Sequence, residues 1–383
     1  MSERRNGGTS VGAGGGLAPS RLVRRSDFVS CHVAFIDCKL PGSTLKENYS
    51  IIGAGVTQAE DQVVNLVEDH GFAIGAAAMP HGVTNNLHIH YTAEVFMIFK
   101  GEWLFRWGAD GKQGEFIGRA GDILSMPTWM FRGFTNIGED DGWIFTALGR
   151  DDTGGVIWHP EILRGAAEHG LFLRRDNMLV DLSAGASKPD DAELLHPLTD
   201  EFIATLHHPS VEEMRARITT AEERRWSDRA LLQSVLPGHA AEMAPVIGWG
   251  MTQDRTARPK VTDPHNFSVE WLRIGAGQSV GPFRVAPKQV LIVQHGSVEI
   301  TLGDGSSVVA GPWDVFSVPA DEWQTLAAVG GEPVTMTVTT AGDARAEIEW
   351  AADTVRDAAV AGWGVDPNGY LAPAHCLPFQ QAA

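Results

Sequence analysis

The stretch "HIHYTAEVFMIFKG", residues 88–101, carries two histidines, a carboxylate and a closing glycine at fixed spacing. His88 and His90 lie two residues apart, so on a β-strand both side chains point to the same face. Glu94 follows four residues later and supplies an anionic oxygen. Imidazole nitrogens and a carboxylate bind iron and related transition metals. The alternative interpretation is a pair of hydrogen-bonded polar histidines at the mouth of a β-barrel, but the spacing favours a metal site.

The bulk composition narrows the classes of function. A chain of 383 residues can hold two or three domains and bury a large core. Its net charge of −18 argues against nucleic acid as a partner, because such a surface repels phosphates. Three scattered cysteines form no disulfide framework, and reduced thiols are typical of a cytoplasmic protein. No apolar run approaches the roughly 18 residues needed to cross a bilayer, so we expect no membrane partner.

The sequence also contains an internal repeat. Residues 72–101 align with residues 267–296 at an offset of 195, and residues 121–132 align with residues 313–324 at an offset of 192. A hairpin loop between the two blocks can absorb the three-residue difference. The repeat pairs each residue of the candidate site with a partner that is no metal ligand: His88 with Phe283, His90 with Val285, Glu94 with Gln289, and Arg132 with Gln324. We therefore expect one site-bearing copy and one degenerate copy.

Each copy has the pattern of antiparallel β-structure. Short β-rich runs are separated by Lys-Gly, Gly-Asp-Gly and Gly-Pro turns, which is typical of a jelly-roll-like barrel. Between the copies, "SVEEMRARI" begins with a capping box and has helical spacing. These patterns predict an all-β protein with a flexible tail at 1–25, a metal-binding domain at 26–155, a partly helical connector at 156–245, a degenerate domain at 246–345 and a C-terminal tail at 346–383.

The spaced residues resemble the signatures of the cupin superfamily. The first signature is matched at five positions: Gly82, His88, His90, Glu94 and Gly101. The second is matched by Gly121, Pro127 and Asn136, while Arg132 stands where the family has a histidine. The chain resembles gentisate 1,2-dioxygenase and its salicylate- and hydroxynaphthoate-cleaving relatives in two features. These are its two-domain length and a tryptophan, Trp129, two residues after the proline. The resemblance implies two cupin domains, and Arg132 departs from the usual three-histidine iron site.

Arg132 cannot bind a metal, because a guanidinium keeps its protons and offers no lone pair. Two roles are open to it. It can hold a substrate carboxylate through its two-pronged geometry, which we prefer, or it can form a salt bridge with Glu94 and leave a metal-free pocket. We expect Arg132 in a catalytic and substrate-binding role. Trp129 and Phe96 are predicted to line the substrate pocket, although a place in the core is the default for aromatic residues on strands.

Two classes of function follow. The first is a ring-cleaving dioxygenase in which His88, His90 and Glu94 hold Fe(II), with Mn(II), Ni(II) or Zn(II) as other ions that suit such donors. Its substrate would be a hydroxylated aromatic carboxylate such as a gentisate or salicylate analogue. The second class is a non-oxidative cupin, either an isomerase or a decarboxylase, or a metal-free protein that binds a small aromatic or aliphatic acid. We expect a homo-oligomer in either case.

Overall fold

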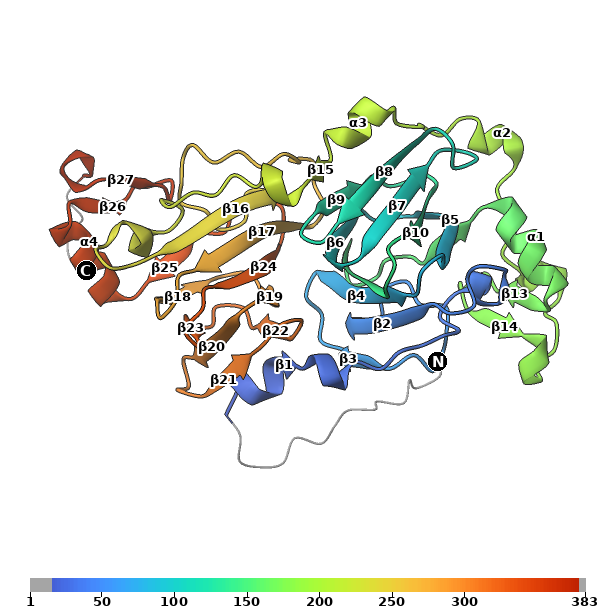
Figure 1. The fold of residues 1–383 in the computed structure, drawn as a ribbon, viewed down its shortest axis with the longest axis horizontal. Helices are drawn as coiled ribbons and strands as arrows, with labels where there is room; N and C mark the ends of the chain where they lie inside the picture. The colour runs from blue at the N-terminus through green and yellow to red at the C-terminus, as the bar shows by residue number, and fades with distance from the viewer. Residues whose placement is uncertain (1–15, 379–383) are drawn as a thin grey trace. The chain divides into compact units, whose positions relative to one another are not determined.

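The structure is a computed structural model, and it describes residues 16–378. The chain divides into two compact units (Figure 1). The first unit covers Phe28–Glu223, and the second contains residues 16–27 together with the described chain from Arg224 onward. Both units consist mainly of antiparallel sheets with few helices, which confirms the predicted all-β class. Within the described residues, no helix combines the length and apolar character that a membrane span requires.

The first unit contains a seven-stranded and a five-stranded sheet whose inner faces share one core. On β7, Trp103, Phe105 and Trp107 point into this core, while the residues between them are less buried. The strand order is β15-β9-β6-β11-β4-β2-β3 in one sheet and β12-β5-β10-β7-β8 in the other. The strands are β2 (Glu47–Ile52), β3 (Val64–Leu66), β4 (Phe72–Met79), β5 (Thr84–His90), β6 (Glu94–Lys100), β7 (Glu102–Trp107), β8 (Gly114–Arg119), β9 (Ile123–Met126), β10 (Arg132–Asn136), β11 (Gly142–Gly149), β12 (Val156–Trp158) and β15 (Ile218–Thr219).

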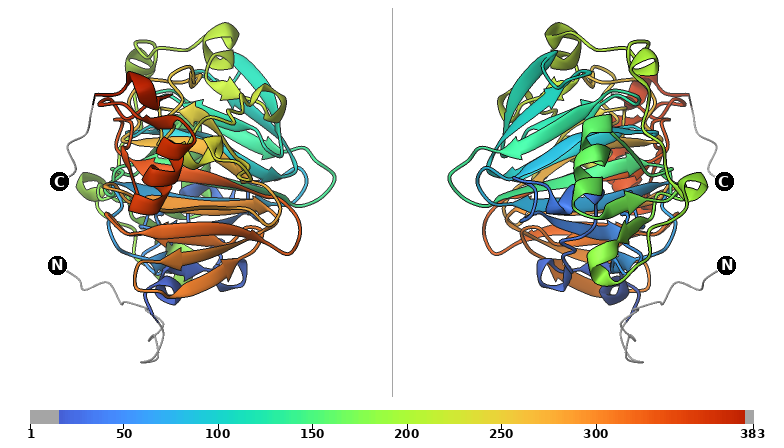
Figure 2. Two further views of the ribbon diagram at one scale, coloured as in Figure 1. Left: turned by 90° about the vertical axis from the view of Figure 1, so that its left-hand side faces the viewer. Right: turned by 90° about the vertical axis from the view of Figure 1, so that its right-hand side faces the viewer.

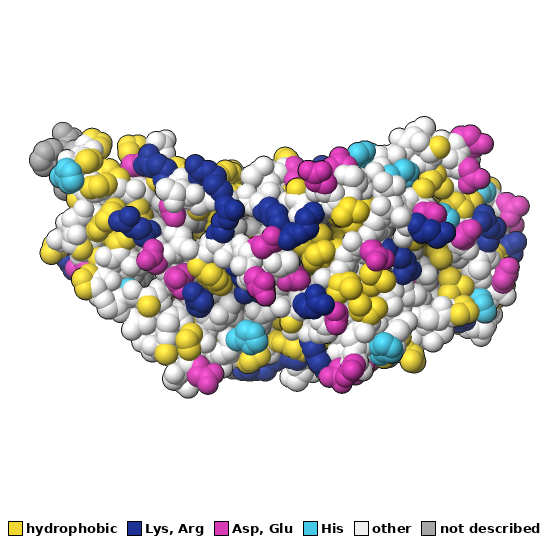
Figure 3. All heavy atoms as spheres, turned by 45° about the horizontal axis from the view of Figure 1, so that its top comes forward, with side chains coloured by type: hydrophobic (Ala, Val, Ile, Leu, Met, Phe, Trp, Pro, Cys, Tyr) yellow, Lys and Arg dark blue, Asp and Glu magenta, His cyan; other side chains and the backbone are white. Residues whose placement is uncertain are grey.

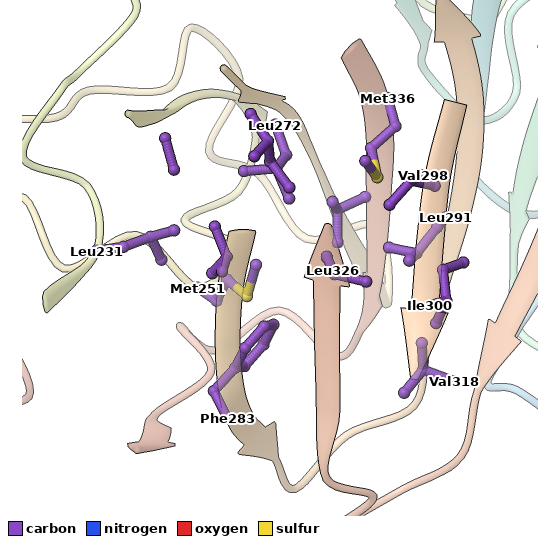
Figure 4. Close-up of a cluster of buried hydrophobic side chains, with 14 of the residues drawn as sticks. Leu231, Met251, Leu272, Phe283, Leu291, Val298, Ile300, Val318, Leu326 and Met336 are labelled. Carbon is purple, nitrogen blue, oxygen red and sulfur yellow. The ribbon is translucent and has the colours of Figure 1, made fainter. Parts of the chain in front are cut away.

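The second unit repeats this arrangement with a six-stranded sheet, β1-β22-β19-β24-β17-β16, and a five-stranded sheet, β21-β20-β23-β18-β25. Figure 4 shows its core, in which Leu272 and Met336 of one sheet lie near Val298 and Leu326 of the other. The strands are β1 (Leu22–Val23), β16 (Ala241–Ile247), β17 (Phe267–Ile274), β18 (Ser279–Val285), β19 (Gln289–His295), β20 (Ser297–Leu302), β21 (Ser307–Ala310), β22 (Val315–Val318), β23 (Gln324–Val329), β24 (Val334–Ala341) and β25 (Ile348–Trp350).

The repeat is longer than the sequence comparison predicted. After β12 in the first unit and β25 in the second, the chain continues with a helix and a small hairpin: α1 (Pro160–Glu168), β13 (Leu171–Leu173) and β14 (Leu179–Asp181) in the first, and α4 (Ala352–Val360), β26 (Trp363–Val365) and β27 (Leu371–Pro373) in the second. Figure 2 shows α4 in the left view and α1 in the right view. Trp158 Nε1 donates to Gln58 Oε1 at 3.2 Å, and Trp350 Nε1 donates to Gln253 Oε1 at 3.1 Å. Much of the predicted connector and of the predicted C-terminal tail therefore belongs to the two repeats.

What remains of the predicted connector is short and partly helical. It contains α2 (Asp200–Ile203) and α3 (Val211–Arg215). Ser210 Oγ caps α3 by accepting a hydrogen bond from Glu213 N, and the carboxylate of Glu213 accepts one from Ser210 N, which is the capping box that the sequence indicated. Acidic and basic side chains are interspersed over the face drawn in Figure 3. On that face the net charge of −18 therefore forms no single acidic patch.

Each unit completes a sheet edge with a segment that precedes the other repeat. In the second unit, β1 pairs with β22 through Leu22↔Phe316 and Val23↔Val315. In the first unit, β15 pairs with β9 through Ile218↔Leu124 and Thr219↔Ile123. This pairing covers an edge that would otherwise expose unpaired backbone groups. Residues 16–25, which belong to the predicted flexible tail over 1–25, instead form structure on the second unit. Residues 1–15 of that predicted tail lie outside the described chain.

Candidate metal centre

Three of the predicted site residues meet at one place in the first unit. His88 and His90 lie on β5, and Glu94 begins β6. One ligand atom from each side chain lies within 4.8 Å of the others, and all three side chains are buried. The distance from His90 Nε2 to Glu94 Oε2 is 3.5 Å. Two imidazoles and a carboxylate at this spacing are donors that one transition-metal ion can share.

Both imidazoles have the protonation that a metal ligand needs. His88 Nδ1 lies 2.7 Å from the carbonyl oxygen of Asn86, and His90 Nδ1 lies 3.5 Å from that of Gly155. A carbonyl only accepts, so Nδ1 carries the proton and Nε2 keeps its lone pair. Burial lowers the pKa of His88 and of His90 well below the usual range, and the charge of Arg132 lowers both further. The two rings are therefore neutral.

Arg132, at the start of β10, forms a buried ion pair with Glu94. Its Nε and Nη2 donate to Glu94 Oε2 at 3.2 and 3.0 Å, and its Nη1 donates to the carbonyl oxygen of Met130 at 3.3 Å. The side chain is fully buried. The salt bridge with Glu94 that the sequence analysis considered is therefore present, and the predicted contact of Arg132 with substrate stays a prediction. The reason for the salt bridge is electrostatic, because a buried guanidinium is costly without a carboxylate partner, and Glu94 is within reach.

The ion pair leaves part of Glu94 available. Among the described residues, no hydrogen bond reaches Glu94 Oε1, since both donors of Arg132 bind Oε2. Burial raises the pKa of Glu94, and the charge and hydrogen bonds of Arg132 act against that rise. Arg132 therefore holds the carboxylate in one orientation, as outer partners of metal ligands commonly do. The donor set of His88, His90 and Glu94 fits a transition-metal ion.

A pocket that is partly open to solvent lies against the same three side chains. His88, His90 and Glu94 form part of its wall, and most of the remaining wall is apolar or aromatic. The aromatic side chains of the wall are Phe35, Tyr49, Phe96, Phe134 and Trp158. No lysine or arginine belongs to the wall. The sequence identified Phe96 but missed the loop residues between 34 and 57, which carry no motif.

Trp129 lies outside this wall. Its side chain is 37% exposed and stacks edge-on against Tyr91 and Phe202, with ring centroids 5.6 and 5.9 Å apart. Its backbone has φ of 56°, a left-handed conformation that is uncommon for a bulky residue. The structure therefore brings Phe96, but neither Trp129 nor Arg132, to the surface of the pocket. His159, a further histidine near this region, caps α1 by accepting from Glu161 N at 3.3 Å.

In the second unit the equivalent positions hold a different set of side chains. Phe283 and Val285 are buried where the first unit has its histidines. Gln324 Nε2 donates to Gln289 Oε1 at 2.9 Å, and Gln289 Nε2 donates to Thr340 Oγ1 at 3.0 Å. A neutral amide pair thus replaces the ion pair of the first unit. Neither an amide nor an apolar side chain is a strong ligand for a transition metal.

Comparison with known proteins supports the architecture. No protein-family model and no curated protein matches the sequence. The formate complex of oxalate decarboxylase from Lactobacillus farciminis is 11% identical with a TM-score of 0.55, over 89% of this chain and 91% of that chain. A mutant of Bacillus subtilis oxalate decarboxylase is 13% identical with a TM-score of 0.54, over 88% of this chain and 80% of that chain. Vicilin from hazelnut, Corylus avellana, is 12% identical with a TM-score of 0.50, over 86% and 88% of the two chains.

These structures are bicupins. This chain has the bicupin fold. The cupin part of the predicted resemblance is therefore confirmed at the level of architecture, whereas the narrower resemblance to gentisate 1,2-dioxygenase stays a prediction. At such low identity the likeness carries the fold and not the reaction, because one fold supports many chemistries. The reaction has to be argued from the pocket.

Proposed function

We propose that this bicupin is a metal-dependent enzyme that cleaves a hydroxylated aromatic carboxylate with oxygen. The observation that carries the proposal is the convergence of His88, His90 and Glu94 on one wall of an aromatic pocket, with both imidazoles neutral. Fe(II) is the ion that suits a two-histidine, one-carboxylate site with open positions, and Mn(II), Ni(II) and Zn(II) suit the same donors. When bound, the ion supplies redox and Lewis-acid chemistry toward oxygen and substrate oxygens.

The residues of the chain would bind and orient the substrate. Phe35, Phe96 and Trp158 offer flat apolar surfaces that match an aromatic ring and exclude water. A divalent ion together with Arg132 outweighs the single charge of Glu94, so the buried site attracts an anion. A carboxylate or phenolate group of the substrate would supply this negative charge. Arg132 acts through Glu94 in this arrangement, and the predicted direct contacts of Arg132 and Trp129 with substrate stay predictions.

A second candidate is a non-oxidative reaction of a small acid, or binding of such an acid without catalysis. The fold similarity to the two oxalate decarboxylase structures and the Glu94–Arg132 ion pair favour this alternative. An ion pair can persist without a metal, because each charge is neutralised by its partner. A homo-oligomeric state and a cytoplasmic location likewise stay predictions.

Oxygen uptake separates the two candidates. Protein loaded anaerobically with Fe(II) is mixed with gentisate, salicylate and hydroxynaphthoate, and dissolved oxygen is followed with an electrode. We expect uptake that depends on one of these acids and disappears in His90→Ala. A matched control is His70→Ala, since His70 is equally buried and also binds a backbone carbonyl, at 2.6 Å. Metal-loaded protein that consumes no oxygen with any of the acids would favour the non-oxidative alternative.

A further inference from the structure

A chain of buried polar groups lies behind His88 and has no role in the site described so far. Lys46 and Asp37 are 1% and 0% exposed and form an ion pair between Nζ and Oδ1. Lys46 Nζ also donates to Asn85 Oδ1 at 2.8 Å. Asp37 Oδ2 accepts from the backbone and side-chain amides of Asn86 at 3.2 and 3.1 Å. The ion pair thus holds the side-chain amides of two neighbouring residues, Asn85 through Lys46 and Asn86 through Asp37.

This chain fixes which way the amide of Asn85 faces. An ammonium group only donates, so Asn85 must present its oxygen to Lys46 and turn its NH₂ group away. Asn85 Nδ2 then lies 3.3 Å from His88 Nδ1. That nitrogen cannot accept, because it donates its own proton to the carbonyl oxygen of Asn86 at 2.7 Å. Among the described residues, the NH₂ group of Asn85 is therefore left without an acceptor.

The unused donor faces a place where a ligand can reach it. Asn85 is part of the pocket wall beside His88, and only 5% of its surface is exposed. A buried donor without an acceptor is costly, and a ligand oxygen would remove that cost. No cationic side chain belongs to the pocket wall, so among the side chains described there a fixed amide donor is well suited to bind an anionic or carbonyl oxygen.

The second unit lacks the ion pair and the side-chain amide of this chain. The positions equivalent to Asp37, Lys46 and Asn85 are Gln233, Ala241 and Val280. Strand register supports this equivalence, since Asn85 pairs with Phe134 on β10 and Val280 pairs with Leu326 on β23. One contact is kept, since Gln233 Oε1 accepts from Gly281 N at 2.7 Å as Asp37 Oδ2 accepts from Asn86 N. Among the described residues, the Asp37–Lys46 ion pair and the Asn85 amide therefore occur in the unit that carries the candidate metal ligands and have no counterpart in the other. A purely structural requirement of the fold would be expected in both.

We propose that Asn85 is a ligand-binding residue that donates a hydrogen bond to a carboxylate, phenolate or carbonyl oxygen held beside the metal. Lys46 is a positioning residue, because it fixes the amide orientation and is not itself part of the pocket wall. The proposal rests on the proposed function for the identity of the site, and it adds the residue that sets the orientation of the ligand. The NH₂ group of Asn85 would favour ligands that have an oxygen acceptor next to the group that binds the metal.

The test compares salicylate binding by wild-type protein and two variants of Asn85. Asn85→Asp keeps an oxygen for Lys46 and replaces the donor with an acceptor, and Asn85→Leu removes the donor without adding charge. Asn65→Asp is the matched control for the substitution, because Asn65 lies on β3 of the same unit and outside the pocket wall. Zinc-loaded protein is titrated calorimetrically, and bound zinc is measured for every variant. A thermal melt of each variant checks folding.

We expect Asn85→Asp and Asn85→Leu to weaken salicylate binding at least tenfold, with zinc content unchanged and Asn65→Asp like wild type. Lys46→Met should cause a smaller loss, because the amide can then rotate. Equal salicylate affinity in wild type and both Asn85 variants would overturn the inference and leave the metal proposal standing. A zinc-loaded wild type that does not bind salicylate would also overturn it. If wild-type protein takes up none of Fe(II), Mn(II), Ni(II) and Zn(II), the proposed function fails, and the same titration without metal still decides the role of Asn85.

Discussion

The two units place different chemistry on the same backbone positions. The first has a Glu94–Arg132 ion pair where the second has a Gln289–Gln324 amide pair, and both pairs are buried. The fold therefore does not need the charges. A buried ion pair rarely stabilises a protein more than a neutral replacement does, so stability alone gives no reason to keep one. Its presence beside His88 and His90 fits a functional demand for a carboxylate with a fixed orientation.

The units also differ in the space beside these positions. Gly75 forms part of the pocket wall in the first unit, whereas the equivalent residue of the second is Glu270. Glu270 is fully buried, and its Oε1 accepts from Met251 N at 2.9 Å. Burial raises the pKa of this carboxyl to about 8. A side chain thus occupies the second unit where the first unit has only a glycine beside its pocket.

Removal of a histidine ligand should give the largest effect. His88→Ala should lower metal affinity by more than about 100-fold, because two remaining donors hold an ion poorly. His70→Ala is the control, since both histidines are 3% exposed and both bind the carbonyl two residues earlier. Metal content after dialysis, measured by mass spectrometry, checks the prediction. If His88→Ala retained one metal ion per chain, the assignment of His88 as a ligand would be wrong.

Loss of one partner should affect the charged pair more than the neutral pair. Arg132→Ala leaves a buried carboxylate unpaired and should destabilise the metal-free protein by about 3 to 5 kcal/mol. Gln324→Ala leaves only an amide oxygen unpaired and should cost about 2 kcal/mol. Urea unfolding of both variants measures the difference. Added Zn(II) should restore part of the loss in Arg132→Ala, because a cation again neutralises Glu94, and it should restore nothing in Gln324→Ala.

Glu270 should give the second unit a pH-dependent stability. Its pKa is about 8 in the folded chain against an ordinary value of 4.5. Between these values the unfolded chain loses the proton while the folded chain keeps it, so stability falls as pH rises. Glu270→Gln should remove this fall and be the more stable protein at pH 8, by a few kcal/mol at most, since each pKa unit is worth about 1.4 kcal/mol. Parallel stability curves from pH 5 to 8 would contradict the assignment.

The smallest expected effect concerns the turn that carries Trp129. The equivalent residue is Asp321, and both have left-handed backbones, with φ of 56° and 57°. Aspartate and asparagine tolerate this conformation better than tryptophan does. Trp129→Asn should therefore change stability by less than about 1 kcal/mol, because relief of strain offsets the lost ring contacts. A calorimetric melt measures this change. If Trp129→Asn bound salicylate as tightly as wild type does, the predicted role of Trp129 in substrate binding would be wrong.

The sequence predicted the fold and the three candidate ligands because both depend on local spacing. Alternation along β5 is enough to place His88 and His90 on one face, and the repeat predicts which copy lacks ligands. The sequence left two partners open for Arg132, a substrate carboxylate and Glu94, since the choice depends on which anion lies nearest in space. Asn85 was missed. The register of β5 against β10 shifts between Arg132 and Phe134, and a sequence pattern does not reveal such a bulge.

The lengths of the repeats were underestimated for a related reason. Gln58 and Gln253 hold Trp158 and Trp350 through single hydrogen bonds, and each pair lies about 100 residues apart in the sequence. A match of a single glutamine or a single tryptophan between the two copies does not stand out when the residues around it differ. The loop residues of the pocket wall were missed because they follow no periodic pattern that links them to the site.

The central claim is that one metal ion binds at His88, His90 and Glu94 in the first unit and none binds at the equivalent place in the second. Crystals grown with Mn(II) or Zn(II) and measured at the absorption edge of the metal test this directly. The anomalous difference map should show one strong peak per chain, in contact with those three side chains, and no peak beside Gln289 and Gln324. An empty first site in metal-saturated crystals, or a peak in the second unit, would contradict the account.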